Sequence, residues 1–268
     1  MFLEPIDFAS MYKAHKKETV FKGKNSDDWD KRSKELAPSM QKSSYVDAFI
    51  SRMDIDENDV ILDIGCGPGT LAIPLAKRVK EVIAIDFSAK MLEELEEYAK
   101  KEGIENIKTF HLGWDDDWSM LPEIDIVVAS RSVEVSDIDA ALMKISSVAK
   151  KACYVTYKVG GSFVDMEILD YIDKKIITKP DFLYIPILLY KNAYLPQIDY
   201  IATQKGSIKS SSAEEFVESL VWSLGSLNEA QKEKAREYYH LYIANNIHPK
   251  PFMWAYISWS TKKGFSLH

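Results

Sequence analysis

The chain has 268 residues, of which 46% are hydrophobic and 28% are charged, so it is long enough and apolar enough to bury a substantial core. This composition excludes a wholly disordered chain. The 34 basic and 41 acidic residues leave a formal net charge of −7, and because an acidic surface repels phosphate, the balance disfavours duplex nucleic acid as a partner.

The cysteine content and the N-terminus bear on the compartment. Cys66 and Cys153 are too few for a disulfide framework and fit a reducing environment. No apolar stretch approaches the ~18 residues that a membrane span requires. The N-terminus carries Glu4 and Asp7 and lacks the basic-then-apolar pattern of a signal peptide. We therefore expect a cytoplasmic protein without a membrane segment.

Helices are expected before the first strand. Ser26 is expected to cap a short helix that ends before Pro38, because serine is a favoured N-cap and proline cannot continue a helix. The three- and four-residue spacing of apolar side chains predicts a second helix over Met40–Met53. We interpret residues 1–55 as an N-terminal helical cap and residues 56–268 as the main domain.

Short apolar runs then alternate with segments of helical periodicity. Helical segments follow the first and second runs, and another precedes the fifth. This alternation is typical of βαβ units, so we predict an α/β fold whose parallel sheet is covered on both faces. The predicted strands are Val60–Ile64, Val82–Asp86, Ile107–Leu112, Ile124–Ser130 and Ala152–Val159.

The alternation loosens in the C-terminal half. Asp165–Thr178 is predicted to be helical, and Phe182–Tyr190 fits either a helix or a strand. The last two strands are expected at Ile198–Thr203 and Phe252–Trp259, with a mostly helical insertion between them at about residues 205–250. The insertion is either a lid over a site or ordinary packing over a sheet edge.

A glycine cluster, Gly65-Cys-Gly-Pro-Gly69, follows the first predicted strand. A strand that leads through glycines into a helix presents backbone N–H groups at the helix N-terminus, and glycine lets a ligand approach the backbone. The spacing is G-x-G-x-G, and position 70 is Thr70, so the third glycine of the dinucleotide fingerprint is absent. This difference disfavours a nicotinamide dehydrogenase.

Two carboxylates accompany the glycines. Asp63 lies two residues before Gly65, and Asp86 ends the second predicted strand. A carboxylate in the position of Asp86 accepts hydrogen bonds from both ribose hydroxyls of a bound nucleoside. Any adenosine ligand satisfies this geometry, so it is the combination of both acids with the glycines in one βαβ unit that indicates a nucleoside-cofactor site.

Two segments resemble the motifs of a known family. Leu62-Asp-Ile-Gly-Cys-Gly-Pro-Gly-Thr70 resembles the first motif of the class I S-adenosylmethionine-dependent methyltransferases, and Val82-Ile-Ala-Ile-Asp-Phe-Ser88 resembles the second. The resemblance covers about residues 60–159 and extends beyond them by element order alone. It implies a Rossmann-like, doubly wound, seven-stranded and mostly parallel sheet with an antiparallel last strand, together with N-terminal helices and a helical insertion.

The same resemblance implies the cofactor S-adenosyl-L-methionine, with S-adenosyl-L-homocysteine as product. The glycine turn would lie against the methionine half, Asp63 would orient the turn or meet the amino group, and Asp86 would bind the ribose. Phe87 would pack on the adenine or belong to the core. The expected cofactor-binding residues are Trp29, Arg32, Asp63, Gly65, Cys66, Gly67, Gly69, Asp86, Phe87, Trp114, Asp115 and Ser130.

Several of these residues also have a simpler explanation. The Asp115 carboxylate is expected to accept a hydrogen bond from the adenine amine, or to belong to a solvated acidic run. Trp114 would form one wall of the adenine site. Trp29 would cover the cofactor or seal a helix, and Arg32 would reach the methionine carboxylate. Cys66 is a small residue that fits the turn. The histidines and cysteines show no spacing typical of a metal site, so no metal is expected.

Catalytic residues leave little trace in the sequence, because methyl transfer from a sulfonium depends mainly on alignment. Arg131, just after the fourth predicted strand, suits an anionic substrate or a carboxylate partner; the alternative is an exposed or helix-packing arginine. His248 precedes the last strand and is either a catalytic candidate or a histidine of a surface loop. The Asn/Asp-Pro-Pro-Tyr motif of relatives that methylate amino groups is absent after Ala129, which counts against N6-adenine and glutamine-amide acceptors.

We expect methyl transfer by direct in-line displacement to a small-molecule acceptor, held in a mostly apolar pocket. Aromatic residues of Tyr184–Tyr200 and of the insertion are candidates to line it. One alternative is methylation of RNA through the basic segment Lys13–Lys34, or of a protein. Another is a non-catalytic module that binds S-adenosylmethionine, although the glycines and Asp86 are all present. The oligomeric state is left open.

Overall fold

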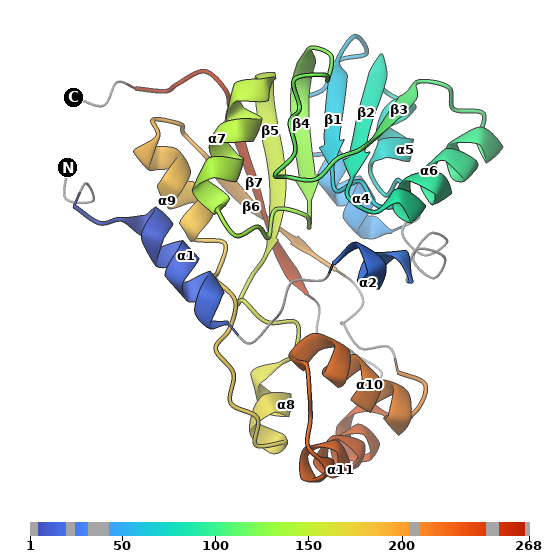
Figure 1. Ribbon diagram of the computed structural model, residues 1–268, viewed down its shortest axis with the longest axis vertical. Helices are drawn as coiled ribbons and strands as arrows, with labels where there is room; N and C mark the ends of the chain where they lie inside the picture. The colour runs from blue at the N-terminus through green and yellow to red at the C-terminus, as the bar shows by residue number, and fades with distance from the viewer. Residues whose placement is uncertain (1–4, 20–24, 32–42, 204–209, 245–251, 266–268) are drawn as a thin grey trace.

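One mixed sheet organises the protein (Figure 1). The computed structural model describes residues 5–19, 25–31, 43–203, 210–244 and 252–265, and within them seven strands pair in the order β3-β2-β1-β4-β5-β7-β6. The strands are β1 (Val60–Ile64), β2 (Glu81–Asp86), β3 (Ile107–His111), β4 (Ile124–Ser130), β5 (Ala149–Lys158), β6 (Gln197–Ala202) and β7 (Met253–Ser260).

The first five strands are parallel. β1 pairs with both β2 and β4, and β5 continues the sheet beside β4. β7 is antiparallel to its two neighbours, β5 and β6, so the last strand in the sequence lies inside the sheet and β6 forms the edge. The predicted Rossmann-like sheet with an antiparallel last strand is confirmed.

Helices cover both faces because the strand side chains alternate between them. On β1, Leu62 packs with one apolar cluster and Ile61 with the other. The Leu62 face is covered by α1 (Phe8–Glu18), α7 (Ile138–Val148) and α9 (Tyr184–Lys191). The Ile61 face is covered by α4 (Ser44–Ile50), α5 (Ala72–Ala76) and α6 (Ala89–Lys101). The molecule therefore has three layers, with one apolar cluster on each side of the sheet.

A second group of helices lies beyond one end of the strands in Figure 1. It is here called the helical cap and is distinct from the predicted N-terminal cap of residues 1–55. It has its own apolar cluster, whose largest fully buried side chain is Phe216. The predicted insertion between β6 and β7 supplies three of its elements, whereas α8 comes from the chain before β6. The elements of the helical cap are α8 (Met166–Tyr171), α10 (Ala213–Leu224), α11 (Glu229–Tyr238) and the π-helix η1 (Tyr239–Ile243).

Three element predictions need correction or completion. The N-cap of α2 (Ser26–Asp30) is Asn25 and not Ser26, because the Asn25 side chain accepts from the Asp28 N–H while Asp28 accepts in return. The predicted helix over Asp165–Thr178 is confined to α8, after which Asp173 takes a positive φ of 52°. Phe182–Tyr190 is helical, as α9.

Some predictions fall outside the described ranges. The helix expected over Met40–Met53 is described from residue 43 onward, as α4, and the positions of Arg32, Pro38 and His248 lie among the residues that the structure does not describe. Within the described ranges, every helix is too short or too polar to span a bilayer.

Candidate functional site

The predicted site residues gather at the carboxyl edge of the sheet. Because β1, β2, β4 and β5 run in parallel, the residues that follow them lie at the same edge. β7 runs the other way, so its start lies at this edge as well, and Trp254 pairs with Lys158 of β5. Asp63, Asp86, Arg131, Lys158 and Trp254 therefore share one side of the molecule.

The turn after β1 uses its three glycines for different reasons. All three have positive φ, of 64°, 54° and 89° in order. A Cβ on Gly65 would lie 2.5 Å from the Cβ of Ser132, and a Cβ on Gly69 would lie 2.4 Å from Leu95. At Gly67 a Cβ would meet no described atom within 4 Å. Gly65 and Gly69 thus permit close packing, and Gly67 exposes backbone to open space.

Asp86 ties the turn to the end of β2. Its Oδ2 accepts from the Gly67 N–H at 2.9 Å and its Oδ1 accepts from the Ser88 N–H at 2.9 Å. The Gly65 and Cys66 amides both donate to the Ile85 carbonyl, at 2.8 and 3.1 Å. The carboxylate is therefore held at a fixed position beside the turn. Burial raises the pKa of Asp86, and the two amide donors counteract the rise.

Asp63 is buried in the same place and is only partly satisfied. Its Oδ2 has no hydrogen-bond partner among the described residues. Burial, and then the nearby charge of Asp86, raise the pKa of Asp63 to about 7. A buried carboxylate oxygen of this kind suits a cationic ligand group, which would compensate its lost hydration.

Cys66 has no sign of reactivity. Its side chain is buried, and burial raises the pKa of the thiol well above its ordinary value. The Sγ lies 3.5 Å from the Gly67 carbonyl oxygen. This placement agrees with a small residue that fills the turn.

The expected adenine side is formed by two adjacent segments. Phe87 is 41% exposed, which excludes the alternative in which it is an ordinary core residue. A Cβ on Gly113 would lie 3.5 Å from the Cβ of Phe87, so the loop after β3 lies against this ring. The Trp114 indole donates to the Ser132 carbonyl at 2.9 Å, which fixes its ring beside the glycine turn.

The acidic residues that follow Trp114 differ in their contacts. Asp116 accepts from the Gly113 N–H at 2.7 Å, and Lys144 donates to the carbonyls of Trp114 and Asp116 at 2.7 Å each. Asp115 has an exposed side chain. The loop is thus held by Asp116 and Lys144, and Asp115 is left at its surface.

A short N-terminal helix lies over the start of α6. Ser88 caps α6, and its hydroxyl donates to Asp30, the last residue of α2. Trp29 precedes this contact and is half-buried. The contact places α2 beside the end of β2 (Figure 1), the region expected to need a cover.

The next part of the edge holds residues that the sequence did not single out. The buried Tyr45 of α4 forms hydrogen bonds through its hydroxyl with Ser130 and Thr156, both at 2.7 Å. Ser130, expected to contact the cofactor, thus also joins β4 to α4. Thr156 in turn accepts from the Arg131 N–H at 3.1 Å. The pairing of Ser130 with Thr156 in the sheet is the feature that brings these groups together.

Arg131 has a constrained position. Its φ is 61°, a left-handed conformation that is rare for residues other than glycine. The guanidinium carbon lies 4.6 Å from the centre of the Tyr45 ring and 5.9 Å from that of Trp254. The guanidinium therefore lies near two aromatic rings that meet each other edge to face, with the Tyr45 ring the nearer of the two.

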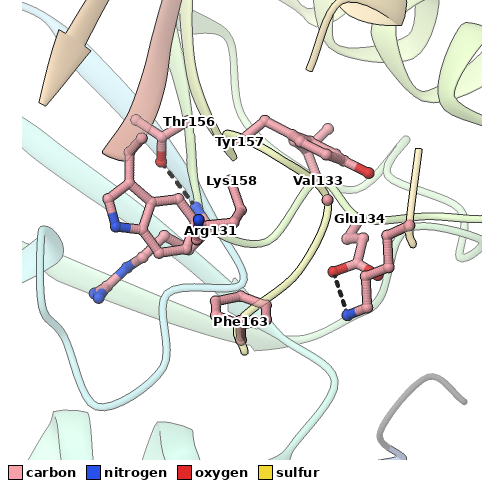
Figure 2. Close-up of a pocket in the computed structure, with 10 residues that line it drawn as sticks. Arg131, Val133, Glu134, Thr156, Tyr157, Lys158 and Phe163 are labelled. Atoms are coloured by element: carbon pink, nitrogen blue, oxygen red, sulfur yellow. Dashed lines mark hydrogen bonds and ion pairs between the residues drawn. The ribbon is translucent and has the colours of Figure 1, made fainter. Parts of the chain in front are cut away.

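A pocket opens beside Arg131 (Figure 2). Its cavity volume of about 30 Å³ is well below the ~300–1,000 Å³ of typical ligand sites, so the pocket is a small recess at the edge of the sheet. In Figure 2, Arg131 and Glu134 lie on opposite sides of it. Glu134 accepts from Lys16 at 2.6 Å and from Lys179 at 2.9 Å. The pocket thus joins the loop after β4, the end of β5, the start of β7 and the segments that flank α8.

Phe163 and Trp254 both line this pocket. Phe163 lies 6.0 Å from Trp254 and 5.8 Å from Phe252, measured between ring centres. Gly161 and Lys179 bring the two ends of the α8 segment together, since the Lys179 N–H donates to the Gly161 carbonyl at 2.8 Å. The described residues contain no group of three or more side chains arranged to hold a metal ion.

Comparison with known proteins agrees with this geometry. A family model described as a methyltransferase domain matches residues 61–152. An uncharacterized protein of Haemophilus influenzae is 32% identical over 267 residues, which are 98% of this chain and 100% of that protein. The 23S rRNA (uracil(1939)-C(5))-methyltransferase RlmD of Aliivibrio fischeri is 31% identical over 74 residues, 28% of this chain and 17% of the relative.

A solved structure supports the fold. A Bacillus halodurans protein proposed to be a methyltransferase superposes with a TM-score of 0.55 at 12% identity, over 81% of this chain and 98% of the other. The sheet order, the glycine turn and the carboxylate after β2 define a Rossmann-like methyltransferase fold. The chain belongs to the class I S-adenosylmethionine-dependent methyltransferases. It is an enzyme whose cofactor is S-adenosylmethionine.

The residues of the site fit this cofactor. The unpartnered Oδ2 of Asp63 suits its amino group, and the open space beside Gly67 is a place that a Cβ would fill. The exposed ring of Phe87 offers an apolar face to a purine.

Proposed function

We propose that the protein transfers the methyl group of S-adenosylmethionine to a small-molecule acceptor bound in the pocket beside Arg131. The contact between Gly65 and Ser132 carries this proposal. Ser132 touches the glycine turn, and its neighbour Arg131 lines the pocket. A donor on the turn and an acceptor in the pocket would therefore lie on either side of the same short segment.

The proposed cofactor contacts follow from the geometry of the turn. Asp63 would meet the amino group, and Asp86 would accept from the ribose hydroxyls with lone pairs that the Gly67 and Ser88 amides leave unused. Phe87 and Trp114 would enclose the adenine, with Asp115 at its edge. Residues 1–55 would cover this site, and residues 56–268 would form the methyltransferase domain.

The bound cofactor supplies an electrophilic methyl carbon on a positively charged sulfur, which leaves as a neutral thioether. As an acceptor lone pair forms its bond to the methyl carbon, the carbon–sulfur bond breaks and its electron pair stays on sulfur; an acceptor proton, where present, passes to water. This chain contributes the alignment of the reacting atoms and the exclusion of water from them. Alignment of the reacting atoms supplies about 7–11 kcal/mol in favourable cases. Tyr45, Phe163 and Trp254 would exclude water beside the acceptor.

The limited extent of the RNA-modifying relatives and the net charge of the chain support a small acceptor over RNA. The relatives named as rRNA methyltransferases match 33% of this chain or less, and the net charge of −7 does not favour a polyanion. The cysteine content supports a cytoplasmic enzyme.

The acceptor class is tested by incubating the protein and a cell extract with methyl-labelled S-adenosylmethionine. We expect the label in the small-molecule fraction, and no incorporation with Asp86→Ala. Label that enters RNA or protein in an Asp86-dependent way would overturn the small-molecule proposal. Binding of S-adenosylhomocysteine, measured by calorimetry with the same two proteins, tests the cofactor site separately.

A further inference from the structure

The charges around the acceptor pocket are unevenly matched. Three cations line it, Arg131, Lys158 and Lys179, against one carboxylate, Glu134. Glu134 is already shared by Lys16 and Lys179. Within the described part of the chain, no carboxylate lies within ion-pair distance of Arg131 or Lys158. This excess of positive charge is unexpected in a protein with a net charge of −7.

Lys158 is half-buried, and within the described residues it has no carboxylate partner. It is the last residue of β5, and its Nζ donates to the Val159 carbonyl at 2.6 Å and lies 4.8 Å from the Phe252 ring centre. Burial lowers the pKa of this amine, an effect that the more distant Asp165 and Asp181 only partly counteract. An anion in the pocket would compensate this desolvation.

Arg131 is arranged to present its donors. Its left-handed backbone is fixed by the hydrogen bond to Thr156, and such conformations cluster at functional sites. Tyr45 and Trp254 lie within 4.6 and 5.9 Å of its guanidinium. A cation–π contact leaves guanidinium N–H groups for other partners, and a carboxylate or a phosphate binds such groups with two parallel hydrogen bonds.

We propose that Arg131 and Lys158 bind an anionic group, a carboxylate or a phosphate, on the small-molecule acceptor, and so determine its specificity. This inference rests on the proposed function. The anionic group is the part of the acceptor that the protein recognises, and it is not the group that is methylated. Pairing with two cations draws electron density away from its oxygens and makes them poorer nucleophiles. Methylation occurs at a second nucleophilic atom of the same molecule, nearer to Ser132.

The test measures the binding of small anions with S-adenosylhomocysteine present. Succinate, benzoate and inorganic phosphate serve as probes, observed by ligand NMR, with Arg131→Gln and Lys158→Met as variants. Lys150→Met is the matched control, since Lys150 lies on the same strand at the opposite edge and pairs with the exposed Glu123. We expect at least one probe to bind, with a loss of tenfold or more in both pocket variants and none in the control.

The arms of the experiment identify the anion. Binding by a carboxylate alone or by phosphate alone assigns the group, and Arg131→Lys, which keeps the charge but loses the two-pronged geometry, should also weaken binding. Unchanged melting temperature and S-adenosylhomocysteine affinity show that each variant is folded. Should one variant fail to fold, the other still decides, because Arg131 follows β4 whereas Lys158 ends β5.

Failure of this inference is distinct from failure of the proposed function. If the wild-type protein does not bind S-adenosylhomocysteine, the proposed function fails. If it binds that compound but none of the anions, or binds them equally well in the pocket variants, only the inference is overturned. The labelled product of the extract should be retained by an anion exchanger in an Arg131-dependent way; a neutral product, or labelled RNA, would also overturn it.

Discussion

Gly65 and Ser132 meet where the turn after β1 touches the loop after β4. A Cβ on Gly65 would lie 2.5 Å from the Ser132 Cβ, and the Ser132 hydroxyl donates to the Ile64 carbonyl at 2.5 Å. The proposed donor and acceptor sides are thus in direct contact through small residues. Larger side chains here would separate the two sides of the site.

Replacement of Gly65 by alanine should therefore be costly in a way that Ser132 controls. Gly65→Ala adds the strain of a positive φ and an overpacked contact, together about 2–4 kcal/mol of unfolding free energy. Ser132→Gly in the same chain should recover about 1–2 kcal/mol of it, measured by urea denaturation as a double-mutant cycle. Additive effects of the two changes would contradict the contact.

Gly67 and Gly103 form a matched pair for the cofactor site. Both have positive φ, 54° and 67°, and a Cβ on either would meet nothing described within 4 Å. Each change to alanine should cost a similar ~1 kcal/mol of stability. Only Gly67→Ala should weaken S-adenosylhomocysteine binding, because only its Cβ enters the proposed cofactor space; wild type gains about 2.7 kcal/mol at a hundredfold excess over Kd. Equal binding by both variants, measured by calorimetry, would remove the assignment.

The raised pKa of Asp63 makes stability depend on pH. The folded-state pKa of about 7 lies above the ordinary value of 3.8, so the folded protein holds the proton more tightly than the unfolded chain. This contribution is fully present below about pH 4 and is lost as the pH rises through 7. Relative to Asp63→Asn, the wild-type melting temperature should fall between these values. Parallel curves for the two proteins would show that Asp63 does not titrate there.

The same carboxylate should respond to the cofactor. An amino group beside Asp63 favours its charged form, so binding of S-adenosylhomocysteine near pH 6.5 should release protons. Calorimetry in two buffers with different ionisation enthalpies measures this release. Asp63→Asn should abolish it, whereas a release that persists in the variant would point to another group.

The hydrogen bond between Ser88 and Asp30 should matter for the cover of the site. Asp30→Ala removes the acceptor that anchors α2 to the start of α6, a contact worth about 1 kcal/mol or more. Cofactor affinity should fall by about fivefold or more, with little change in melting temperature. Asp27→Ala is the control, because Asp27 lies on the exposed side of the same helix. Equal losses in the two variants would show a general effect of α2.

Replacement of Arg131 by glycine should reduce the activity with little change in stability. Arg131→Gly relieves a left-handed backbone, worth about 1–2 kcal/mol, and loses cation–π contacts with the Tyr45 and Trp254 rings that are worth a similar amount. The melting temperature should therefore change by only a few degrees. Methyl transfer to the natural acceptor should fall tenfold or more while S-adenosylhomocysteine still binds. A fully active Arg131→Gly would exclude a role in acceptor binding.

The sequence predicted those features that are local in the chain. The apolar runs, the G-x-G-x-G turn and Asp86 are read from neighbouring residues, and the structure has them where the spacing indicated. Tyr45 and Thr156 could not be found in this way. They meet Arg131 only because β4 and β5 pair in one register and α4 packs behind them.

The residues on the proposed acceptor side could not be predicted from the sequence for a related reason. Trp254 reaches Arg131 because β7 runs antiparallel between β5 and β6, which places the start of that strand at the carboxyl edge. α8 joins the helical cap through an apolar cluster whose members lie on both sides of β6 in the sequence. Such contacts depend on the final topology, which the periodicity of a single segment does not contain.

The helical cap draws its two stretches of chain into a cluster that shares no residue with the clusters on either face of the sheet. Substitutions that reshape it would leave the glycine turn and its carboxylates intact. A lineage carrying this architecture is thereby free to vary this part of the chain while keeping the turn that is proposed to hold the cofactor.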